Sequence, residues 1–208
     1  MKARYGTIPI LVLLLGGAAA AEIIDRIAVI VGNRVITESE IEREIRVTAF
    51  LNREPPDLSP AARRKAADRL IEQKLVRREL ELSRYPQPAP AEVEPLYRGL
   101  EVRHGGAAGL RKALENYGFT ESALREHLLW QLTLMRFIDV RFRPGISISE
   151  QEVQEYYEKH LNGAGNLEQY REKIEQALTN ERINQDLDRW LQRARTRNRI
   201  EYKEAVFR

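Results

Sequence analysis

Apolar residues recur with helical spacing along most of the chain, and the densest stretch covers residues 120–140 (TESALREHLLWQLTLMRFIDV). Thr120 is a suitable N-cap, and Glu121 favours the positive end of the helix dipole. Apolar positions cover most of this helix's circumference, which is typical of a helix that several neighbours bury. Charged residues interrupt every apolar run before the ~20 residues that a bilayer requires. We expect a central helix that its neighbours wrap completely, or only in part with an apolar groove left open.

β-branched residues are concentrated in one place, residues 22–36 (EIIDRIAVIVGNRVI). Gly32 and Asn33 can supply the positive φ angles of a tight hairpin turn between two strands. Residues 199–202 (RIEY) look like a further short strand. Because a lone hairpin is marginal in water, we expect this strand to pair near the hairpin.

Capping residues and breakers divide the remainder into helices. Thr37 with Glu40, and Ser149 with Glu152, form capping boxes, and residues 104–109 (HGGAAG) read as a flexible break. Residues 141–146 read as extended. The helices are expected at residues 38–51, 60–84, 92–102, 110–117, 120–140, 150–161 and 167–196. The pattern predicts a mostly α fold in which a small sheet joins the two ends of one domain, residues 22–208.

Residues 1–21 have the pattern of a secretory signal peptide. Lys2 and Arg4 form a basic start, and residues 8–15 (IPILVLLL) form a short apolar segment. Small residues supply the expected cleavage site: Ala19, Ala20 and Ala21. We therefore expect export from the cytoplasm, with no membrane insertion after the signal is removed.

Composition narrows the classes of function. The chain of 208 residues contains no cysteine, which excludes a disulfide framework and a cysteine-linked lipid anchor and fits a bacterial envelope protein. Its 34 basic and 31 acidic residues are nearly balanced, whereas nucleic-acid binding usually shows a clear basic excess. We expect no nucleic-acid partner.

Candidate catalytic groups do not form a constellation. The three histidines, His104, His127 and His160, lie in unrelated contexts without a metal-ligand spacing. The sequence also lacks the G-x-S-x-G motif. We predict a protein that is not an enzyme and that carries no metal or cofactor.

Large apolar residues in and just after the central helix allow two interpretations. In the first, they pack in the protein's own hydrophobic core. In the second, they line a groove for extended polypeptide, because methionine and aromatic side chains adapt to many partners. The candidate groove residues are Trp130, Leu134, Met135, Phe137 and Phe142.

The order of these segments resembles the SurA-type periplasmic chaperone family, which is related in layout to parvulin-type prolyl isomerases. The resemblance covers most of the chain after the signal peptide. Its stretches are 24–45 (IDRIAVIVGNRVITESEIEREI), 66–80 (AADRLIEQKLVRREL), 110–139 (LRKALENYGFTESALREHLLWQLTLMRFID), 146–160 (ISISEQEVQEYYEKH) and 170–192 (YREKIEQALTNERINQDLDRWLQ). The resemblance implies a helical chaperone core that binds unfolded outer-membrane proteins in the periplasm without ATP.

One departure from the family changes the expected activity. In the family, one or two parvulin domains precede the closing helix, whereas only residues 160–166 occupy that place here. We therefore do not carry the isomerase activity over. Two alternatives stay open: an isomerase-related foldase, and an assembly subunit, a homodimer included, whose groove a partner fills permanently.

Overall fold

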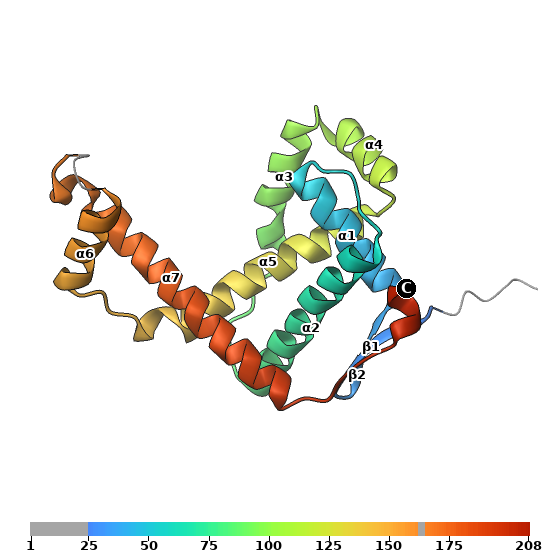
Figure 1. The fold of residues 1–208 in the computed structure, drawn as a ribbon. Coiled ribbons are helices and arrows are strands. Elements are labelled where there is room, and N and C mark those ends of the chain that lie inside the picture. Colours follow the sequence, from blue (N-terminus) through green and yellow to red (C-terminus); the bar gives the residue numbers. More distant parts are fainter. Residues whose placement is uncertain (1–24, 162–164) are drawn as a thin grey trace, which may run out of the picture.

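The computed structural model describes residues 25–161 and 165–208 as a mostly helical molecule with one small antiparallel sheet (Figure 1). This confirms the predicted fold class. The predicted signal peptide, with its cleavage residues Ala19, Ala20 and Ala21, lies outside the described residues.

The sheet joins segments from opposite ends of the chain. Its order is β2-β1-β3, with β1 (Ile27–Val31) paired antiparallel to both β2 (Arg34–Thr37) and β3 (Ile200–Tyr202). Gly32 adopts a φ of 62° in the turn after β1, whereas Asn33 does not adopt the positive φ expected of it. The N–H of Gly32 donates to the carbonyl of Arg199 over 2.8 Å. The third strand lies where the sequence predicted it and supplies the pairing that a lone hairpin lacks.

Two capped helices follow the hairpin and pack against each other. α1 (Glu38–Asn52) begins with the predicted capping box, in which Thr37 and Glu40 each accept a backbone N–H of the other. α2 (Pro60–Leu82) begins after Ser59, whose hydroxyl caps the helix while proline occupies its first position. Side chains directly before each helix, or in its first turn, therefore determine where α1 and α2 begin.

A pair of shorter helices comes next, α3 (Glu94–Arg103) and α4 (Ala107–Tyr117). The expectation of a break over residues 104–109 is wrong in its second half, because α4 begins three residues before the predicted Leu110. Two alanines with high helix propensity favour this earlier start. Only glycine has room at position 109 of α4, because the Cβ of any other residue would lie 1.9 Å from the carbonyl oxygen of His104.

The central helix is α5 (Glu121–Arg141), as predicted, and it crosses the middle of the molecule (Figure 1). Thr120 caps it by accepting the N–H of Ala123 over 3.2 Å. Its neighbours wrap it only in part, since Met135 is 60% exposed and Val140 also faces solvent.

Short 3₁₀ turns connect or end several elements: η1 (Pro90–Val93), η2 (Arg143–Gly145) and η3 (Glu204–Phe207). The extended conformation expected over residues 141–146 is therefore wrong. Proline at the second residue of η2 has a φ that suits a helical turn, so the chain continues to turn after α5.

α6 (Glu150–His160) and the first half of α7 (Leu167–Thr196) form an arm that projects from the body (Figure 1). The predicted capping box of Ser149 and Glu152 starts α6. The backbone N–H and hydroxyl of Ser149, together with the guanidinium of Arg182 on α7, lower the pKa of Glu152 to about 2. The same carboxylate therefore caps one helix and ties it to the next.

Buried apolar residues form three clusters. The sheet cluster contains Ala28, Val29, Val31, Ile36, Ile41, Ile45, Ala66, Ala67, Leu70, Ile71, Leu75 and Val206. The α3–α4 cluster contains Val47, Phe50, Val93, Tyr97, Leu100, Leu110, Leu114, Phe119, Ala123, Leu124 and Leu128. The α5–α7 cluster contains Val76, Trp130, Phe137, Phe142, Ile183, Trp190 and Leu191. Two of the three clusters include residues of α5, which confirms its central place.

Candidate functional site

Three of the five predicted groove residues are buried in the α5–α7 cluster: Trp130, Phe137 and Phe142. Phe137 is 1% exposed and Phe142 is 9% exposed, and their rings meet edge to face with centroids 5.8 Å apart. Phe137 also contacts the rings of Tyr85 and Trp190, at 5.3 and 5.4 Å. Placing Phe137 in an open groove is therefore corrected, because three other rings cover it. Phe142 lies at the edge of a separate hollow beside Trp190 and does not line the cleft that Trp130 borders.

Two of the five predicted residues line one cleft. Trp130 and Leu134 lie one helical turn apart on α5 and face the same space. Trp130 is 9% exposed, while Leu134 is only partly buried against the α5–α7 cluster. Met135 is exposed but does not line this cleft. The structure thus brings together two of the five candidates.

We call this space the apolar cleft; its volume is about 320 Å³. Side chains from α1, α2, α5 and α7 enclose it, so residues far apart in sequence form one surface. Its lining residues are Glu44, Thr48, Arg69, Leu70, Glu72, Gln73, Val76, His127, Trp130, Gln131, Leu134, Leu187 and Leu191. We call the six apolar residues of this set the apolar wall and the seven polar or charged residues the rim.

The α2 and α7 walls of the apolar cleft were not among the predicted site residues. Leu70 and Val76 come from α2, and Leu187 and Leu191 come from α7. Their helical spacing in the sequence indicates a buried face. Spacing alone does not tell which members of such a face border a cleft, since this depends on how α2 and α7 cross α5.

The partly buried carboxylate of Glu44 connects several groups of the rim. Glu44 on α1 accepts hydrogen bonds from Arg69 Nε over 3.0 Å and from Thr48 Oγ1 over 3.3 Å, and lies 3.5 Å from Nδ1 of His127. Burial would raise the pKa of Glu44, but the hydrogen bonds and charges of His127 and Arg69 outweigh burial and lower that pKa. These contacts tie α1 to α2 and α5, which is a structural role for His127.

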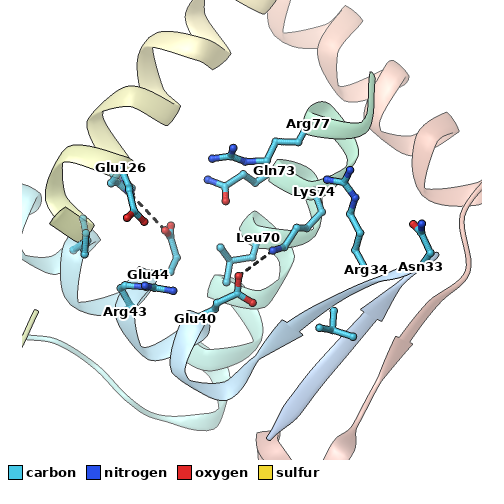
Figure 2. Close-up of a pocket in the computed structure, with 14 residues that line it drawn as sticks. Asn33, Arg34, Glu40, Arg43, Glu44, Leu70, Gln73, Lys74, Arg77 and Glu126 are labelled. Carbon is cyan, nitrogen blue, oxygen red and sulfur yellow. Dashed lines mark hydrogen bonds and ion pairs between the residues drawn. The ribbon is translucent and has the colours of Figure 1, made fainter. Parts of the chain in front are cut away.

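A second, charged cavity of about 610 Å³ adjoins the first (Figure 2). It lies among the β1–β2 hairpin, α1, α2 and α5. Its lining residues are Asn33, Arg34, Val35, Glu40, Arg43, Glu44, Val47, Leu70, Gln73, Lys74, Arg77, Ala123, Glu126 and His127. Four of these also line the apolar cleft: Glu44, Leu70, Gln73 and His127. The charged cavity and the apolar cleft are therefore neighbours across a shared wall.

Within residues 25–161 and 165–208, no group of three or more His, Cys, Asp or Glu side chains is placed to hold a metal ion. Over the same ranges, no helix combines the length and the apolar character that crossing a membrane requires.

Comparison with protein-family models gives no match to this chain, and the search of curated proteins likewise finds none. The resemblance to the SurA-type family therefore stays a prediction drawn from the residues.

Proposed function

We propose that this protein is an ATP-independent chaperone that holds unfolded exported polypeptides, outer-membrane β-barrel proteins among them, in the apolar cleft. The observation that carries the proposal is the cleft itself, where Trp130, Leu134 and Leu187 form part of an apolar wall beside an ion-paired rim. The predicted signal peptide supports a periplasmic setting.

The chemistry of such clients matches the cleft. Strands of transmembrane β-barrels alternate apolar and polar residues and carry aromatic girdles. Before they insert, these strands offer unpaired edges and aggregate in water. A cleft of about 320 Å³ lies at the lower end of ligand-pocket volumes, so it accepts only a few client side chains at a time. Contacts of that size are weak, and release needs no nucleotide.

The first test compares aggregation of an unfolded β-barrel protein with and without this protein. The wild type, at a near-stoichiometric ratio, is expected to delay aggregation after dilution from urea, as followed by light scattering. The double variant Leu134→Gln with Leu187→Gln places two amides in the apolar wall and removes contact area from any client. We expect the concentration that gives half-maximal delay to rise roughly tenfold.

A matched control is Val102→Gln, because Val102 on α3 is 80% exposed and lies outside both cavities. This variant should delay aggregation as the wild type does. Equal delay by the double variant and the wild type would contradict the role of the apolar cleft. A wild type that gives no delay and elutes as a stable dimer would favour an assembly subunit instead.

A further inference from the structure

Most charges that line the charged cavity are already paired. Lys74 Nζ donates to Glu40 over 2.9 Å, one of the two interactions dashed in Figure 2. Glu44 is paired with Arg69, which lies outside this cavity. Two of the three carboxylates in the lining are therefore neutralised by close cations.

The cations are less completely paired. Arg34 forms a salt bridge with Glu81, which lies outside the charged cavity. Arg43 on α1 and Arg77 on α2 form no hydrogen bond and no ion pair with any residue of the described ranges. Figure 2 shows both side chains extending into the cavity from different helices. Two guanidinium groups thus face the same space without an anion in direct contact with either of them.

Arg77 lies in an environment that disfavours its charge. Burial lowers its pKa, and the nearby charge of Arg34 lowers it further. Its guanidinium carbon lies 4.8 Å from the ring centroid of Trp130, so one face of the group contacts the indole. The charges of Glu126 and Glu81 offset these effects only in part, so an anion bound beside the apolar cleft would supply further compensation.

We propose that the charged cavity binds a carboxylate of the held polypeptide between Arg43 and Arg77. Guanidinium groups match carboxylates in geometry and charge. The amide of Gln73 lies on the shared wall and makes no hydrogen bond within the described residues. One client segment can therefore place an apolar side chain in the cleft and a carboxylate in the cavity. This inference rests on the proposed function, to which it adds a preference for acidic clients.

Glu126 is the competing carboxylate. It lies in the same cavity, accepts a hydrogen bond from the Ser122 hydroxyl over 3.1 Å, and has no ion pair within 4 Å among the described residues. Its charge acts on Arg77 from a longer distance. Removing that charge should strengthen binding of an external carboxylate, whereas removing the arginines should weaken it.

The test uses acetylated, fluorescently labelled peptides of about nine residues with one apolar core sequence, and fluorescence anisotropy as the readout. One peptide is neutral and amidated, one has a free terminal carboxylate, and one is amidated with internal glutamates. The full chain is expected to bind a carboxylate peptide roughly tenfold more tightly than the neutral peptide at low salt. Added salt should reduce this difference. The two acidic peptides show whether the terminal or the side-chain carboxylate is preferred.

Two variants with opposite expected effects test whether the charged cavity binds the carboxylate. Arg43→Gln with Arg77→Gln should bring the acidic peptide down to the affinity of the neutral one, while Glu126→Gln should tighten the acidic peptide a few-fold. All three residues are largely exposed, Arg77 even though its neighbours partly desolvate its guanidinium, so folding should survive the substitutions, and circular dichroism checks it. Equal affinities for neutral and acidic peptides, unchanged in both variants, would overturn the carboxylate site alone. Failure to bind any peptide would overturn the proposed function as well.

Discussion

Replacing Phe137 by alanine is expected to lower the free energy of unfolding by about 3–5 kcal/mol. Phe137 is 1% exposed and packs edge to face against the rings of Tyr85, Phe142 and Trp190. The variant leaves a cavity where α5 meets α7, and the surrounding rings cannot fill it completely. Urea unfolding followed by circular dichroism measures the change.

Met135→Ala is the matched control, since Met135 is a large apolar residue on the same helix and is 60% exposed. Its effect on the unfolding free energy should stay within about 0.5 kcal/mol. A change below 1 kcal/mol for Phe137→Ala would show that its ring is not part of a packed core. Such a result would support the sequence-based prediction that Phe137 lines an open groove.

Val206→Asp is expected to cost roughly 3–5 kcal/mol of unfolding free energy at neutral pH, because it buries a charge without a partner. Val206 belongs to the sheet cluster, where residues from near the start of the described chain meet residues from its end. Burial should raise the pKa of the introduced carboxyl in the folded state. The cost is therefore largest above this raised pKa and shrinks as the pH falls and the carboxyl becomes neutral. Urea midpoints measured at several pH values follow the effect.

Val102→Asp is the matched control, because it makes the same valine-to-aspartate change at a position that is 80% exposed. It should alter stability by less than about 1 kcal/mol, some of it from an acid near the C-terminal end of α3. If Val206→Asp were as mild as this control, the C-terminal segment would not be packed into the sheet cluster.

Local chemistry made much of the fold predictable. Thr37 with Glu40, and Ser149 with Glu152, fix the first turns of α1 and α6 by contacts between near neighbours in sequence. The hairpin turn at Gly32 is likewise set by its own residues. The errors fall where weak signals compete, as at residues 104–109, where two alanines begin a helix that the neighbouring glycines seemed to exclude.

The candidate site was only partly predictable. Trp130, Leu134 and Phe137 follow the i, i+4, i+7 spacing of one helix face, and Met135 lies off that face. This spacing could have separated Met135 from the others. It could not have shown that Phe137 meets Trp190 of α7, because that contact depends on how two distant helices cross.

The charged cavity had no sequence signal. Arg43 and Arg77 lie in helical segments where charges alternate, a pattern that usually indicates a solvated face. Their meeting in one cavity depends on the packing of α1, α2, α5 and the hairpin.

Photo-crosslinking from position 134 tests most directly whether client chains occupy the apolar cleft. The chain has no cysteine, so Leu134→Cys gives one unique attachment point for a benzophenone probe. We expect an unfolded β-barrel protein to crosslink efficiently at this position and poorly at a probe on Val102→Cys, with a neutral apolar peptide competing at the first position only. Equal crosslinking at both positions, or none at Leu134→Cys while aggregation is still delayed, would contradict the account.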